Sequence, residues 1–196
     1  THELRTPLTL ILGPLEDMQK ETSLPAKQAQ KLSVIHQSAL RLLNLINQIL
    51  EFRKTETQNK KLCVSKGNIA PLIYEIGLKY KELNQKTKID FQIQIEKEEM
   101  LLFFDKEIIT IVLDNLISNA IKYTEQGRVT LSLYQTMRNE VAYTEIKVSD
   151  TGYGISAEAL PHIFDRYYQE SGKHQASGTG IGLALVLSLI HISEPT

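Results

Sequence analysis

Cysteine is almost absent from the chain, and neither sign of charge predominates. Cys63 is the single cysteine among 196 residues, so no internal disulfide can form and no cysteine cluster can hold zinc or an iron–sulfur centre. We expect Cys63 to be a small strand residue. Lys and Arg number 22 against 23 Asp and Glu. Proteins that bind nucleic acid need a basic surface, so this balance predicts no direct nucleic-acid partner.

Long hydrophobic runs are also absent. No stretch reaches the ~18 apolar residues of a membrane-spanning helix, and the N-terminal region lacks the residue order of a signal peptide. We therefore expect this chain to be soluble. Hydrophobic residues make up 42% and charged residues 23% of the sequence, which is typical of globular proteins and excludes collagen-like and disordered classes.

The first quarter of the chain has heptad spacing, in two runs separated by the turn-forming residues 22–25. The runs are Leu4, Leu8, Ile11, Leu15, Met18 and Leu32, Ile35, Ala39, Leu42, Ile46, Ile49. This pattern predicts an antiparallel helical hairpin over 1–55, with a bend near Pro7. Because a lone hairpin leaves apolar seams exposed, we expect a homodimer with a four-helix bundle. An inert coiled coil is the alternative on these residues alone.

Residues 56–196 have a different pattern, in which alternating strands and amphipathic helices follow a polar linker at 53–61. Strands are predicted at 61–65, 89–95, 101–104, 129–133 and 144–148, and helices from the cap Asn68 to 85, at 105–123 and at 181–190. Helices on one face of a mixed sheet make an α/β sandwich. The whole chain is thus predicted to be α+β, a helical hairpin followed by a sandwich.

Two segments of this second part carry candidate ligand-binding residues on or beside regular structure. Asn115 and Asn119 lie one helical turn apart, with Lys122 three residues further, so their side chains are expected to point the same way. A solvated polar face is the alternative. Asp150-Thr151-Gly152-Tyr153-Gly154-Ile155 follows a strand, where Gly152 and Gly154 would permit close approach of a flat ligand. A plain turn would also explain that segment.

Two further segments lie nearer the C-terminus. One is Ile163-Phe164-Asp165-Arg166-Tyr167-Tyr168, and the other is Gly178-Thr179-Gly180-Ile181-Gly182-Leu183, which opens the last helix. The glycine segment follows no strand, so it is not a Rossmann fingerprint, and it lacks the Gly-Lys-Ser/Thr of a P-loop. Glycine N–H groups at a helix N-terminus are suited to bind phosphate.

Taken together, these motifs resemble a known family. His2-Glu3-Leu4-Arg5-Thr6-Pro7-Leu8 resembles the phosphoacceptor box of two-component sensor histidine kinases. The four later segments resemble the N, G1, F and G2 boxes of that family, in the same order. The resemblance implies a dimerising phosphotransfer hairpin at 1–55 and, at 56–196, an ATP-binding sandwich of the type shared with gyrase and Hsp90. Residues 10–16 also resemble hybrid sensors, which carry a receiver domain on the same chain.

The resemblance implies a role for each motif residue in the kinase reaction. His2 would attack the γ-phosphate of ATP, and Glu3 would orient the imidazole and accept its proton. Thr6 would help position water in dephosphorylation. Asn119, with Asn115 beside it, would hold Mg²⁺. The phosphoryl group would then pass to an aspartate on the receiver domain of a response regulator.

The resemblance also implies a nucleotide site. Lys122 would meet phosphate, Tyr123 would pack on adenine, and Asp150 would accept a hydrogen bond from the adenine amine, which predicts ATP over GTP. Residues 155–177 would form a lid, in which Arg166 contacts phosphate while Phe164 and Tyr167 dock on the hairpin. The predicted nucleotide-binding residues are Asn115, Asn119, Lys122, Tyr123, Asp150, Gly152, Gly154, Ile155, Phe164, Arg166, Tyr167, Gly178, Thr179, Gly180, Ile181, Gly182 and Leu183.

The chain departs from this family at both ends. It starts without Met inside a predicted helix, so we interpret it as the cytoplasmic part of a longer sensor anchored in the inner membrane by segments outside it. Residues 187–196 do not continue as the family does, which predicts a C-terminally truncated sandwich with an unpaired sheet edge. Two alternatives stay open: an ATPase of the wider superfamily that drives closure, and a catalytically silent signalling scaffold.

Overall fold

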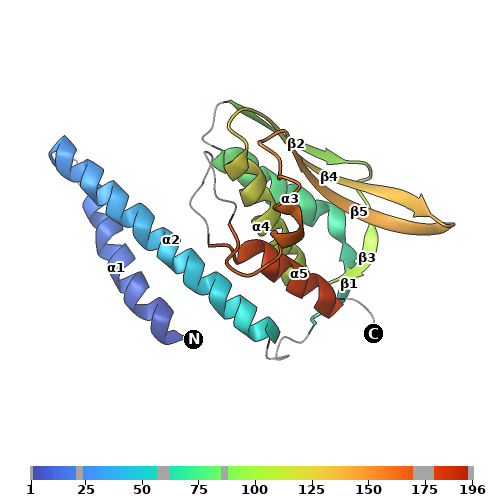
Figure 1. Cartoon of the computed structure of the whole chain (residues 1–196), viewed down its shortest axis with the longest axis horizontal. Helices are drawn as coiled ribbons and strands as arrows, with labels where there is room; N and C mark the ends of the chain where they lie inside the picture. The colour runs from blue at the N-terminus through green and yellow to red at the C-terminus, as the bar shows by residue number, and fades with distance from the viewer. Residues whose placement is uncertain (1, 21–23, 57–61, 85–87, 170–178, 194–196) are drawn as a thin grey trace. The chain divides into compact units, whose positions relative to one another are not determined.

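The computed structural model describes residues 2–20, 24–56, 62–84, 88–169 and 179–193 (Figure 1). The chain divides into two compact units, Thr1–Lys60 and Lys61–Thr196, and each is described by itself. Within the described ranges, no helix is both long enough and apolar enough to cross a membrane.

The first unit is the predicted helical hairpin. Its helices are α1 (His2–Lys20) and α2 (Ala26–Glu56), which pack against each other. Leu8 and Leu12 of α1 and Leu32 of α2 are buried between them. One boundary prediction is wrong: α2 continues to Glu56, so residues 53–56 are helical and not linker. The bend near Pro7 stays a prediction.

Several heptad residues of the hairpin remain exposed in the single chain. Leu8 and Leu32 are buried, but Ile11, Ile35 and Leu42 are between 46% and 52% exposed. The contact between α1 and α2 therefore uses only part of the apolar seam. The rest of the seam is left without a covering element among the described residues, which is the surface that a second hairpin would cover in a bundle.

The second unit is a sandwich of helices and two small sheets. Its elements are β1 (Ser65–Asn68), α3 (Ile69–Leu83), β2 (Ile89–Ile95), β3 (Leu101–Phe104), α4 (Lys106–Tyr123), β4 (Gly127–Arg138), β5 (Val141–Asp150), the short 3₁₀ helix η1 (Leu160–His162) and α5 (Gly182–Ser193). β1 pairs with β3, antiparallel. The larger sheet has the order β2-β4-β5, with β2 parallel and β5 antiparallel to the central β4.

The predicted strand at 61–65 is wrong. The strand there is β1, which starts at Ser65, and residues 62–64 have no regular structure. Cys63 consequently lies outside any strand and is exposed. Strands β4 and β5 also extend further than predicted, because Asn139 and Glu140 form a tight hairpin turn between them, with φ angles of 49° and 65°.

The core of this unit lies between one face of the larger sheet and the helices α3 and α4, which contact each other and the sheet (Figure 1). The alternation predicted for β4 holds, since Val129, Leu131 and Leu133 all face this core and are at most 1% exposed. From the helices, Ile73 and Ile117 are fully buried against them. The predicted α+β architecture is confirmed, and α5 packs on α4.

Two side-chain caps fix where α3 and α4 begin. Asn68 Oδ1 accepts hydrogen bonds from the N–H groups of Ala70 (3.2 Å) and Met100 (2.9 Å), so it caps α3 as predicted. Asp105 Oδ1 caps α4 through the N–H of Glu107 and that of the next residue. The other carboxylate oxygen of Asp105 accepts the N–H of Cys63 at 2.7 Å, which attaches the start of the unit to the start of α4.

Candidate functional site

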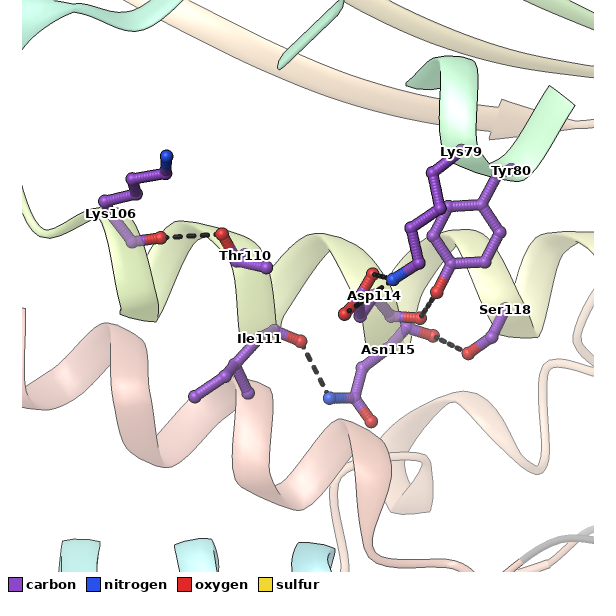
Figure 2. A network of polar contacts seen from close by, with 8 residues as sticks. All are labelled: Lys79, Tyr80, Lys106, Thr110, Ile111, Asp114, Asn115 and Ser118. Carbon is purple, nitrogen blue, oxygen red and sulfur yellow. Dashed lines mark hydrogen bonds and ion pairs between the residues drawn. The ribbon is translucent and has the colours of Figure 1, made fainter. Parts of the chain in front are cut away.

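The two asparagines of α4 differ in burial, and the prediction that their side chains point the same way stays a prediction. Asn115 is buried, and its Nδ2 donates to the main-chain oxygen of Ile111 at 2.8 Å (Figure 2). Its Oδ1 is directed at α5, because a Cβ on Gly182 would lie only 2.7 Å from it. Asn119 is half-buried one turn later. Asn115 therefore packs α4 against α5, and Asn119 is the asparagine nearer to solvent.

The C-terminal turn of α4 presents a cation beside an aromatic ring. Lys122 Nζ lies 3.0 Å from Tyr123 Oη and 4.5 Å from the centre of the Tyr123 ring. The Tyr123 ring is partly exposed, at 38%. A phosphate group could replace the phenol oxygen as the partner of Lys122, since an ammonium binds phosphate as a point charge.

The segment after β5 is attached to this same end of α4. Asp150 Oδ1 accepts the Gly152 N–H at 2.9 Å, and the Tyr153 N–H donates to the Tyr123 main-chain oxygen at 3.3 Å. A Cβ on Gly152 would lie 2.4 Å from that oxygen, whereas one on Gly154 would meet nothing within 4 Å. The absence of a side chain at Gly152 thus allows close packing on α4, and only Gly154 borders open space.

Tyr153 makes a second contact that the sequence analysis did not anticipate. Its Oη donates to Glu125 Oε2 at 2.6 Å, and this hydrogen bond raises the pKa of Tyr153 above its usual value. The phenol therefore stays protonated as the donor. The two residues are 28 positions apart. No spacing pattern links them, so the pair could be found only from the folded chain.

The third and fourth predicted segments also meet. The Tyr167 N–H donates to the Gly180 oxygen at 2.8 Å. Tyr167 and Gly180 have φ angles of 64° and 67°, and a Cβ on Gly180 would lie 2.6 Å from the Tyr167 Cα. Gly180 is thus required both for its backbone conformation and for this close approach. Phe164 and Tyr167 are 42% and 70% exposed.

The start of α5 has the features of an anion site. Thr179 Oγ1 accepts the N–H of Ile181 at 3.3 Å, and the first hydrogen bond into the helix runs from Leu185 N to the Ile181 oxygen at 2.9 Å. The N–H groups of Gly182, Leu183 and the residue after them lie in the first helical turn, which carries the positive end of the helix dipole. Gly178 lies outside the described residues.

The four predicted segments of the second unit are therefore brought together in three steps. α4 contacts the segment after β5 through Tyr123, α4 contacts the start of α5 through Asn115, and that start contacts the Tyr167 segment through Gly180. Near the end of α4, the exposed residues are Asp150, Gly154 and Ile155. Further along the chain, Phe164 and Arg166 are also exposed. His2, Glu3 and Thr6 belong to α1, in the other unit, and their side chains are outside the described part.

No group of three or more His, Cys, Asp and Glu side chains that could hold a metal ion occurs among the described residues. Mg²⁺ bound together with a nucleotide needs few protein ligands, because it keeps waters and takes phosphate oxygens. One amide oxygen, such as that of Asn119, is chemically suited to complete such a set. The residues present thus fit Mg²⁺ carried by a nucleotide and do not form a dedicated metal cage.

Comparison with known proteins decides the family. The family model for the His Kinase A (phospho-acceptor) domain matches residues 1–58, and the model for the histidine kinase-, DNA gyrase B- and HSP90-like ATPase matches residues 104–193. The chain belongs to the sensor histidine kinases of two-component systems. The resemblance inferred from the sequence motifs is confirmed, and so is the sandwich type of this histidine kinase.

Among curated relatives of this histidine kinase chain, Histidine kinase P4 of Formosa agariphila is 34% identical over 100% of the chain. Hybrid signal transduction histidine kinase D of Dictyostelium discoideum is 31% identical, also over 100%, and the ArcB homolog of Haemophilus influenzae is 34% identical over 98%. The chain spans 14%, 13% and 58% of these three proteins, respectively.

Solved histidine kinase structures show the same fold. Full-length ShkA in complex with AMPPNP has a TM-score of 0.74 and 26% identity, covering 96% of this chain and 38% of that one. The catalytic domain of the histidine kinase ThkA has a TM-score of 0.54 and 27% identity, covering 66% of this chain and 80% of that one. The folds of the described elements are thus shared with experimentally determined kinases.

Proposed function

We propose that this chain is the catalytic core of a protein-histidine kinase, which transfers the γ-phosphoryl group of ATP to His2 and then to an aspartate of a response-regulator receiver domain. The observation that carries the proposal is the meeting of the four predicted segments around α4 in the second unit, combined with a phosphoacceptor motif on α1. Neither feature alone is specific for a histidine kinase. Together they supply a nucleotide site and an acceptor.

In this proposal the second unit binds ATP through the residues predicted above. Asn119 is assigned to Mg²⁺ and Lys122 to phosphate oxygens. Tyr123 packs on adenine, and the first N–H groups of α5 at Gly182 and Leu183 receive phosphate. Mg²⁺, when bound, neutralises negative charge on the phosphate oxygens. Asn115 has a weaker claim as a metal ligand, because its Oδ1 already faces Gly182.

The transfer step balances with residues of this chain. An imidazole nitrogen of His2 forms a bond to the γ-phosphorus, the bond from that phosphorus to the bridging oxygen breaks, and ADP leaves. Glu3 accepts the proton from the other ring nitrogen. Thr6 is assigned to the reverse function, in which a positioned water removes the phosphoryl group from the partner protein.

The expected partners follow from the hairpin and from the relatives. Exposed heptad residues such as Ile11 and Ile35 support a homodimer, in which two hairpins form a four-helix bundle. One relative is named a hybrid kinase, which supports a receiver domain either on the same chain or on a separate one. We place this core in the cytoplasm, where ATP is available, with a membrane anchor in segments outside the chain.

The direct test is incubation of the chain with γ-labelled Mg-ATP. We expect label that is stable in base and labile in acid, because a phosphorus–nitrogen bond has that stability and a phosphate ester of Ser or Thr does not. Quenched samples are compared after acid and base treatment. A chain that binds Mg-ATP and never acquires such label would favour the ATPase that only drives closure, and a chain without nucleotide binding would favour the scaffold.

Base selectivity tests the assigned role of Asp150. Its carboxylate is expected to accept the amine of adenine, and guanine has a carbonyl at that position, so two acceptors would face each other. Such a mismatch costs ~1–3 kcal/mol, so Mg-ATP should bind roughly 5- to 150-fold more tightly than Mg-GTP in calorimetric titrations. Asp150→Ala should weaken Mg-ATP binding and reduce the difference in affinity between Mg-ATP and Mg-GTP. Equal affinity of the unchanged chain for both nucleotides would contradict the assignment.

A further inference from the structure

Three side chains join α3 to α4 at the helical turn that carries Asn115 (Figure 2). Lys79 Nζ lies 3.0 Å and 3.3 Å from the two carboxylate oxygens of Asp114, and Tyr80 Oη donates to the main-chain oxygen of Asp114 at 3.2 Å. Lys79 Nζ also lies 5.0 Å from the centre of the Tyr80 ring. We name Lys79, Tyr80 and Asp114 the α3–α4 cluster. None of its members was among the predicted site residues.

The cluster holds α4 from a different side than the α5 contact does. Figure 2 shows Asp114 directed at α3 and the neighbouring Asn115 directed at Ile111 and away from α3. Asn115 is fixed in turn by its own hydrogen bond to Ile111 and by Ser118 Oγ, which donates to the Asn115 main-chain oxygen at 3.1 Å. Gly182 lies against Asn115 on the α5 side. Successive residues of α4 are thus held from two directions.

The helical turn that carries Asn115 determines where the following turn of α4 lies. Asn119 is four residues after Asn115, so it follows one helical turn along the same axis. A rotation of α4 about its axis would move the Asn119 amide sideways, because a side chain lies several ångströms from the helix axis. A displacement of ~1 Å in a positioning group can change a rate by as much as ~100-fold. The fixed rotation therefore matters to any group that Asn119 binds.

We infer that the α3–α4 cluster is a positioning device, which sets the rotation of α4 and so places the Asn119 amide for Mg-ATP. The inference rests on the proposed nucleotide site, and it assigns three further residues to the positioning of Asn119. Lys79, Tyr80 and Asp114 touch no substrate in this account. They act through the backbone of α4.

The chemistry of the cluster suits this role better than a role in stability. The Lys79 and Asp114 side chains are 50% and 35% exposed, so solvent screens their ion pair and it adds little to folding. Burial is the main cause that raises the pKa of Tyr80 well above its usual value, followed by the nearby Asp114 charge. The phenol hence remains a hydrogen-bond donor at physiological pH. Removing either group should leave the fold intact, because Leu113, Ile117 and Ala120 still anchor α4 in the core, and should allow a small shift of the turn that carries Asp114.

The test compares Lys79→Met and Tyr80→Phe with the control Lys81→Met in the full chain. Lys81 is an exposed lysine of the same helix, so its replacement changes the charge equally and leaves the contacts of Asp114 in place. Mg-ATP is titrated by calorimetry, and ATP is titrated again in EDTA. Both cluster variants should bind Mg-ATP about tenfold more weakly, with melting temperatures and affinity in EDTA close to those of the control.

A charge exchange provides the rescue experiment. Lys79→Glu and Asp114→Lys should each weaken Mg-ATP binding, and the double variant should recover most of it, because the ion pair is restored with its sign reversed. Cluster variants that bind like Lys81→Met would overturn the inference, as would a loss that is equal in EDTA or that follows the melting temperature. If the unchanged chain binds no Mg-ATP, the proposed function itself fails, which is a separate outcome.

Discussion

Replacing His2 with Ala is expected to abolish acid-labile labelling from γ-labelled Mg-ATP. The imidazole nitrogen is the atom that would form the bond to phosphorus, and alanine has no nucleophile to replace it. Alanine is also the best helix former, so the start of α1 at this position should remain helical. Mg-ATP affinity, measured by calorimetry, should change by less than about twofold, because the nucleotide residues are in the other unit.

The matched control for this variant is His191→Ala. His191 is an exposed histidine on α5, and it has no role in the proposed transfer. That variant should label as fully as the unchanged chain. Acid-labile label that persists after the His2 replacement would mean that another residue is the acceptor, and the role of the α1 motif would have to be given up.

Gly152→Ala is expected to damage the nucleotide site severely. The new methyl group would lie 2.4 Å from the Tyr123 main-chain oxygen, so the segment after β5 would have to move away from α4. That movement would separate Asp150 from Tyr123, the two residues assigned to adenine. Overpacking of this kind typically costs ~1–3 kcal/mol, and the misplaced groups should weaken Mg-ATP binding roughly 10- to 100-fold in calorimetric titrations.

Gly154→Ala provides the comparison within the same segment. Its Cβ would meet nothing within 4 Å, although its φ of +73° disfavours a side chain. The expected cost is the backbone strain alone, about 1–2 kcal/mol, without displacement from α4. Mg-ATP affinity should therefore fall much less than for Gly152→Ala. Equal losses in the two variants would contradict the importance assigned to the close contact between Gly152 and Tyr123.

Much of the fold could be predicted because its determinants are local. Heptad spacing is sufficient to identify the hairpin, since it encodes one apolar helix face, and the alternation around Leu131 identifies a strand with one buried side. The caps Asn68 and Asp105 mark where α3 and α4 begin, because each accepts N–H groups from the first turn of its own helix.

The prediction was wrong where non-local contacts decide the structure. The register of β1 is set by pairing with β3, which starts 33 residues after Asn68 and places Leu101 opposite it. Local propensity over 61–65 contains no information about that partner. Asn115 and Asn119 are equivalent by spacing, yet α5 packs on one of them and buries it. A helix that returns from a distant part of the chain makes the difference.

The order of the motifs indicated which segments belong together, but not the contacts between them. Spacing suggested that Gly152 borders a ligand, whereas the folded chain places the Tyr123 main chain there. The pairing of Tyr153 with Glu125 and that of Lys79 with Asp114 span 28 and 35 residues. Hydrogen bonds between side chains so far apart have no periodicity to detect.

The bond between the Cys63 N–H and the Asp105 carboxylate also has a mechanical consequence. The same carboxylate caps α4, so the place where the chain enters the second unit is tied directly to the first turn of the helix that bears Asn119. A pull on the preceding segment would reach α4 through one side chain, although Cys63 and Asp105 are 42 positions apart in the sequence. A pulling force from the preceding part of the chain would thus act first on α4.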